Sequence, residues 1–121
     1  MPGTIVHFEL PSADADRAVG FWSGLFGWEI GPSMMPEGEY RMFQNAEKQG
    51  GAVMAGPHTT PGSGLVVYFD TDDIEGSIAK VRELGGTADD KQPVPTFGWF
   101  STCKDTEGNS FSLWQSDENA A

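Results

Sequence analysis

The sequence predicts an α+β fold built from two successive βαβββ modules, because a strand and helix at the N-terminus return in fainter form later in the chain. With one constant shift in numbering, Val6 to Leu10 aligns with Leu65 to Phe69, and Asp14 aligns with Asp73. A segment rich in Pro, Gly and Thr separates the two copies. The 121 residues are therefore predicted to form one domain, with a first module at 4–56, a linker at 57–63, a second module at 64–115 and a flexible tail at 116–121.

The first module begins with a strand at residues 4–10, in which side chains alternate between two faces. One face carries His7 and Glu9, and the other carries apolar residues that would meet a core. A helix capped by Ser12 or Asp14 follows, because apolar residues recur there at helical spacing: Ala15, Ala18, Val19, Trp22, Leu25 and Phe26. Gly27 ends this helix, and three strands are predicted after it, at residues 28–30, 40–44 and 51–54.

The second module begins with an apolar run at residues 65–69, which is typical of a strand covered on both faces. Asp72 and Glu75 form a predicted capping box for a second helix. The apolar stripe of this helix consists of Ile74, Ile78, Val81 and Leu84, and two glycines end it. A weak polar strand within 87–94 and two clearer strands at 99–103 and 109–114 complete the module.

The composition narrows the possible partners. Eighteen acidic residues against seven basic ones give a formal charge of −11, whereas nucleic acids and anionic membranes attract clustered Lys and Arg. No apolar stretch is long enough to span a membrane, and no secretion signal is visible. Cys103 is the single cysteine, which fits a reducing compartment. We therefore expect a soluble cytoplasmic protein that binds neither nucleic acid nor membranes.

Five segments carry a family resemblance that covers nearly the whole chain. They are His7 in its apolar strand, DADRAVGFW at 14–22 running into LFGW at 25–28, FDTDDI at 69–74, LGG at 84–86, and DTEGNSFSL at 105–113. In this order and spacing they resemble the vicinal oxygen chelate superfamily, which includes glyoxalase I, bleomycin-resistance proteins, fosfomycin-resistance enzymes and extradiol dioxygenases. The resemblance implies two cupped mixed sheets around a cavity, and a homodimer. It leaves open whether the modules pair within one chain or swap between two.

The resemblance also implies where a metal would bind. Members of this superfamily hold a divalent metal with His, Gln or Glu side chains from both modules, and the metal chelates two neighbouring substrate oxygens. His7 is the one family ligand position that this sequence retains, since the matching positions hold Val66 and Ser112, and residues 51–54 contain no ligand type. One imidazole cannot supply the three or four ligands of a catalytic metal, so we predict no metal cofactor. A set of His7, Glu9 and His58 stays open as the alternative.

Seven residues are candidates for a small-molecule site. His7 and Glu9 share a strand face, and Ser112, by its family counterpart, faces the cavity together with Trp114. Aromatic and thioether side chains would complete an apolar pocket with few polar groups. The full set is His7, Glu9, Tyr40, Met54, Trp99, Ser112 and Trp114. For each a structural role is the alternative, with His7 as a hydrogen-bonded histidine and the aromatic residues in the core or a dimer interface. The predicted pocket rims are the corner at 97–99 and the loop at Met34 and Met35.

Three functions remain open at this point. The first is metal-free binding of a small, partly aromatic molecule, as in bleomycin-resistance proteins. The second is a lyase or dioxygenase of the same superfamily, which uses a displaced metal set, or no metal and His7 as general base. The third is a dimeric interaction or regulatory module without a small ligand. We predict the first, because the segments typical of the fold are kept while the family's ligand positions are lost.

Overall fold

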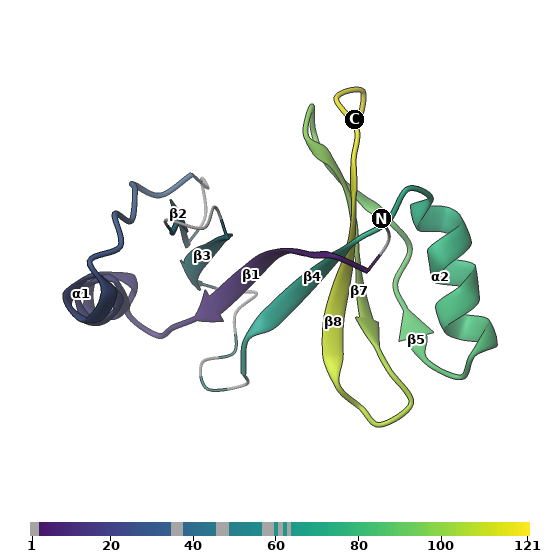
Figure 1. The fold of residues 1–121 in the computed structure, drawn as a ribbon, viewed down its shortest axis with the longest axis horizontal. Coiled ribbons are helices and arrows are strands. Elements are labelled where there is room, and N and C mark those ends of the chain that lie inside the picture. The colour runs from purple at the N-terminus through teal and green to yellow at the C-terminus, as the bar shows by residue number, and fades with distance from the viewer. Residues whose placement is uncertain (1–2, 35–37, 46–48, 57–59, 61, 63) are drawn as a thin grey trace. The chain divides into compact units, whose positions relative to one another are not determined.

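The computed structural model describes residues 3–34, 38–45, 49–56, 60, 62 and 64–121. The chain divides into two compact units, a first unit of residues 7–66 and a second unit of residues 1–6 with 67–121. Each unit combines one helix with β-strands (Figure 1). The predicted α+β class is therefore confirmed.

The first unit contains α1 (Ala15–Phe26) and the strands β1 (Ile5–Pro11, from His7 onward), β2 (Glu39–Gln44) and β3 (Gly50–Ala55). β3 pairs in parallel with β1 and antiparallel with β2. The N-cap of α1 is Asp14, whose Oδ1 accepts a 3.1 Å hydrogen bond from the backbone N–H of Arg17. Gly27 ends the helix in the left-handed conformation, with φ of 70°. Both helix boundaries confirm the prediction.

One face of this three-stranded sheet packs against α1. Leu10, Phe43 and Val53 are almost fully buried and form one apolar cluster with Ala15. Trp28 stacks on Phe43, with ring centroids 4.5 Å apart, and belongs to the same packed region.

The strand predicted at residues 28–30 is wrong. The described backbone there has no strand pairing, and the connection makes only an isolated bridge between Ser33 and Arg41. The apolar residues of this segment, Trp28 and Ile30, pack against the α1 core instead of entering the sheet. The first module is consequently βαββ, with two full strands after its helix.

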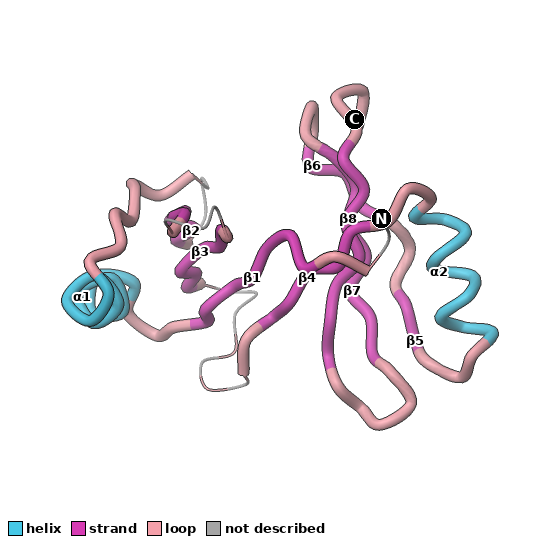
Figure 2. The backbone as a smooth tube through the Cα atoms, viewed as in Figure 1, coloured by secondary structure: helices cyan, strands magenta, loops and turns pink. Residues whose placement is uncertain are grey.

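The second unit contains β4 (Val66–Asp70, from Val67 onward), α2 (Ile74–Glu83), β5 (Thr87–Ala88), β6 (Gln92–Val94), β7 (Gly98–Lys104) and β8 (Ser110–Ser116). β8 pairs in parallel with β4 and antiparallel with β7, and both β5 and β6 pair antiparallel with β7. The weak strand predicted within 87–94 is thus two short strands, of which β6 forms a hairpin with β7 (Figure 2). The core of this unit consists of Ile74, Ile78, Cys103 and Leu113.

The start of α2 differs from the predicted capping box at Asp72 and Glu75. The N-cap is Asp73, whose Oδ1 accepts a 3.0 Å hydrogen bond from the backbone N–H of Gly76. This shift places Ile74 at the first helical position, where it is 2% exposed. The N-cap therefore lies directly before Ile74, the first helical residue, which the core buries.

The residues after β8 make specific contacts. Ala120 is 3% exposed, and its carbonyl oxygen accepts a 2.9 Å hydrogen bond from the backbone N–H of Thr96. The carboxylate of Asp117 accepts a 3.0 Å hydrogen bond from the indole N–H of Trp99. These contacts hold the predicted tail against the β6–β7 turn; its flexibility in solution stays a prediction.

Several sequence predictions fall largely or wholly outside the described residues. The linker predicted at 57–63 is described only at Thr60 and Gly62, and Met35 and His58 lie outside the description. Among the described residues, no helix is both long and apolar enough to cross a membrane.

Candidate functional site

The face of the first unit's sheet opposite α1 carries four of the seven predicted site residues. It is named the open face below because α1 packs on the other side, and its central residues Glu9 and Ala52 are 7% and 0% exposed. Tyr40 lies opposite Met54 in the β2–β3 pairing, and Glu9 lies opposite Ala52 in the β1–β3 pairing. Paired residues of a ladder point to the same side, and His7 shares the side of Glu9 because it lies two positions earlier. The register therefore brings His7, Glu9, Tyr40 and Met54 to one face.

A chain of hydrogen bonds joins three of these side chains. The Tyr40 hydroxyl donates to Glu9 Oε2 over 2.6 Å and lies 2.7 Å from His7 Nε2. His7 Nε2 and Glu9 Oε2 are 4.0 Å apart, so the phenol oxygen bridges them. Glu9 is only 7% exposed, and a carboxylate buried to this degree needs such donors.

Burial also sets the charge state of His7. It lowers the pKa of the imidazole from its ordinary value of 6.5, because desolvation penalises the charged form. His7 is therefore neutral at pH 7. The group formed by His7, Tyr40 and Glu9, hereafter the His7–Tyr40–Glu9 chain, combines a neutral imidazole, a phenol and one carboxylate.

In the second unit, Ser112 and Trp114 lie on the sheet face opposite α2. Their partners across the β7–β8 ladder are Thr102 and Phe100, whereas the neighbouring pair of Ser101 and Leu113 lies on the α2 side. The indole of Trp114 lies over Gly98, where a β-carbon would come within 2.6 Å of the ring. Gly98 thus provides the space for this ring, a role that sequence reasoning missed.

Trp99 does not share that face. It lies opposite Gln115 in the ladder and packs against the α2 core cluster. Its indole N–H binds Asp117, and the Lys91 ammonium lies 4.2 Å from its ring centroid. Phe97, in the predicted rim corner, is 68% exposed and follows Thr96, a non-glycine residue with φ of 69°. The described contacts of Trp99 thus lie on the α2 side of the second unit, and its place in a ligand site stays a prediction.

The side chains that the structure describes do not form a donor set for the metal that the superfamily resemblance implies. Among the residues that the structure describes, no three His, Cys, Asp or Glu side chains lie close enough together to hold a metal ion. His7 Nε2, which could ligate one, lies within hydrogen-bond distance of the Tyr40 hydroxyl. His58, the remaining histidine of the chain, is outside the description.

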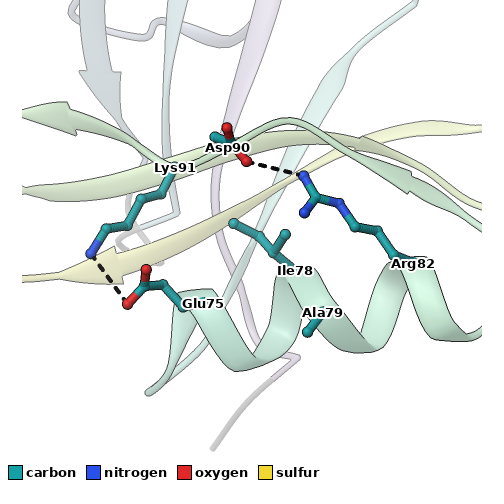
Figure 3. Close-up of a pocket in the computed structure, with 6 residues that line it drawn as sticks. All are labelled: Glu75, Ile78, Ala79, Arg82, Asp90 and Lys91. Atoms are coloured by element: carbon teal, nitrogen blue, oxygen red, sulfur yellow. Dashed lines mark hydrogen bonds and ion pairs between the residues drawn. The ribbon is translucent and has the colours of Figure 1, made fainter.

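A groove of ≈ 200 Å³ runs beside α2 in the second unit (Figure 3). Its charged residues face one another as two ion pairs, Lys91 with Glu75 at 3.7 Å and Arg82 with Asp90 at 3.2 Å. It contains none of the seven predicted site residues. Because the cations and carboxylates of the groove neutralise one another in these ion pairs, we expect the groove to attract a charged ligand only weakly.

Residues 6–114 match the glyoxalase-like domain family. The chain belongs to this family. A glyoxylase-like domain-containing protein of Didymella fabae is 29% identical to it over 92% of both chains. The anthracycline biosynthesis protein DnrV of Streptomyces peucetius is 29% identical over 94% of this chain, which spans 47% of the length of DnrV.

A solved structure agrees on the fold of this glyoxalase-like protein. The structure is that of a glyoxalase/bleomycin resistance protein/dioxygenase superfamily member from Vibrio splendidus. It superposes with a TM-score of 0.70 at 18% identity, over 94% of this chain and 99% of the other. The family match confirms the predicted superfamily, and this superposition confirms the predicted fold alone.

Proposed function

We propose that this glyoxalase-like protein binds a small, partly aromatic molecule on the open face of the β1–β3 sheet, without a catalytic metal. The His7–Tyr40–Glu9 chain is the observation that carries the proposal. It presents partly buried polar groups, ordered by mutual hydrogen bonds, beside the thioether of Met54. A few placed polar groups beside apolar side chains are typical of small-molecule sites.

The charges of this face favour a neutral or cationic ligand. Among the described residues of β1, β2 and β3, Glu9 is the only formally charged side chain on the open face. Arg41 lies on the α1 side and binds Asp16 over 2.7 Å. The whole chain carries a charge of −11, which repels polyanions such as coenzyme A esters. The similarity to an anthracycline biosynthesis protein supports a polycyclic aromatic ligand.

Titration of daunorubicin, an anthracycline with a protonated amine, tests this proposal through the change in its own fluorescence. We expect saturable binding that weakens at least tenfold in Glu9→Gln, because this change removes the one charge of the open face. Glu29→Gln, the same substitution in an exposed connection, is the matched control and should bind as the wild type does. No saturable binding, or equal affinities of the two variants, would overturn the proposal.

A second candidate function is an enzyme in which His7 acts as general base. The neutral imidazole supports it, because a base must be unprotonated at working pH. The test is elemental analysis of untagged protein, followed by glyoxalase and catechol dioxygenase assays with Ni²⁺, Zn²⁺, Mn²⁺ and Fe²⁺. We expect no stoichiometric metal and no turnover. About one tightly held metal per chain, lost in His7→Ala, would overturn the metal-free proposal.

The proposal includes a cytoplasmic homodimer. Three apolar side chains of α1, Phe21, Leu25 and Phe26, are each more than half exposed, which supports a surface that a second chain covers. Sedimentation equilibrium of the untagged chain tests this point. A mass of one chain at all concentrations would refute the dimer and would also remove support for the interaction-module alternative.

A further inference from the structure

We propose that Tyr40 is a positioning residue that holds His7 in the tautomer with its proton on Nε2. In this tautomer Nε2 has no lone pair with which to coordinate a metal ion. The inference rests on the proposed metal-free site and names the residue that makes the site metal-free. Tyr40 then takes the place that a metal has in the superfamily's catalytic members, as the partner of the retained histidine.

The phenol oxygen of Tyr40 lies between two side chains of β1. It lies 2.7 Å from His7 Nε2 and 2.6 Å from Glu9 Oε2, while these two atoms are 4.0 Å apart. Both distances are within the range of strong hydrogen bonds. The hydroxyl therefore bridges two side chains that could otherwise both face a cation.

The number of protons on these groups fixes which atom donates in each hydrogen bond. A phenol has one proton, and the Tyr40 hydroxyl donates it to the Glu9 carboxylate, which accepts only. The contact between the Tyr40 oxygen and His7 Nε2 then needs a proton from the imidazole. In the neutral ring that proton lies on Nε2, and the lone pair lies on Nδ1. A metal ligand needs its lone pair on the coordinating nitrogen, so Nε2 cannot ligate while the bridge exists.

Neighbouring backbone and side-chain groups hold Tyr40 itself in place. Its backbone N–H donates to Ser33 Oγ over 3.1 Å, and its carbonyl oxygen accepts from the backbone N–H of Met34 over 2.9 Å. The β2–β3 register fixes it opposite Met54. The N–H and carbonyl of Tyr40 thus both bond to residues 33 and 34 at one edge of β2, while the other edge of the strand pairs with β3. This anchoring keeps the phenol beside the β1 side chains that it bonds.

The experiment is a two-bond ¹⁵N–¹H correlation spectrum of the histidine rings in full-length untagged protein at pH 7.5. The chain has two histidines, so a His7→Gln variant assigns the signals. We expect His7 in the wild type to show the tautomer with the proton on Nε2. Tyr40→Phe should shift His7 towards a mixture of tautomers, and Met42→Leu, on the same strand face, should leave it unchanged.

Titration of Zn²⁺ into the same samples gives a second readout. The His7 signals should respond to Zn²⁺ in Tyr40→Phe at concentrations at least tenfold below those needed in the wild type. A wild-type His7 with its proton on Nδ1 would overturn the inference without any variant, as would an unchanged tautomer in folded Tyr40→Phe. These readouts need no organic ligand, so a failure of daunorubicin binding with the expected spectra would reject the proposed function alone.

Discussion

Replacement of Gly98 by alanine tests whether the Trp114 indole needs the space that a glycine leaves at this position. A β-carbon at Gly98 would lie 2.6 Å from Cζ2 and 2.9 Å from Cη2 of Trp114, and it would also meet the carbonyl oxygen of Gln115. The indole must therefore leave its position, or β7 must shift against β8. Either movement raises the free energy of the folded state, because β7 and β8 pair over their whole lengths.

The expected cost follows from the packing. Forcing a methyl group into an occupied position destabilises a protein by about 1–3 kcal/mol. For a chain of 121 residues this lowers the thermal midpoint by roughly 4–12 °C. Urea unfolding and calorimetry measure the loss. The indole N–H resonance of Trp114, which donates to Ser116 Oγ over 3.0 Å, reports whether the ring has moved.

Gly24→Ala is the matched control. Gly24 lies in α1, and a β-carbon there would have no neighbour within 4 Å. The same substitution should therefore stabilise the protein by about 0.5–1 kcal/mol, through helix propensity. A Gly98→Ala variant as stable as the wild type, with an unmoved Trp114 resonance, would refute the packing argument.

Three further predictions follow from burial. Ile74→Ala should lower the free energy of unfolding in urea by about 2–5 kcal/mol, because Ile74 is 2% exposed. Ile5→Ala is the control and should change it by about 0.5 kcal/mol or less, because Ile5 is 61% exposed. Equal effects of the two substitutions would contradict this prediction. Burial lowers the pKa of His7 below its ordinary value of 6.5, so the unfolded chain binds a proton at this imidazole more readily than the folded chain does. The contribution of the neutral His7 to the free energy of unfolding is therefore present above pH 6.5 and is lost as the pH falls through the folded pKa. An NMR titration midpoint of His7 at or above 6.5 would disprove this prediction. Cys103 is 1% exposed and burial raises the pKa of its thiol, so Ellman's reagent should react with it far more slowly in the native protein than in urea; equal rates would show that the site opens.

The relation between sequence and structure is clearest within single elements. Alternation along β1 predicted that His7 and Glu9 share a face opposite Leu10, and the β1–β3 register confirms it. Helical spacing and a glycine stop predicted α1 with its boundaries. These signals are local, because the period of a strand or helix depends only on neighbouring residues.

The local signals are weaker for residues whose position depends on a partner far away in the chain. Trp28 reads as a strand residue by its β-propensity, but its ring stacks on Phe43 and so belongs to the α1 core. Trp99, a predicted pocket aromatic, lies opposite Gln115 on the α2 side, where its other expected role in the core fits, and its contact with a ligand stays a prediction. A shift of one position in pairing reverses the face of every side chain, and no local pattern specifies that register.

The sequence by itself determined the fold class, the two helices and the superfamily, because residue type and spacing carry each of them. Only the tertiary structure decided which side chain meets His7. Tyr40 lies 33 positions away in the chain, and the pairing of β1 and β2 with the same central strand β3 brings its hydroxyl between His7 and Glu9. The chemistry of the candidate site arises from that pairing, since a hydrogen-bonded bridge requires contact in space rather than nearness in sequence.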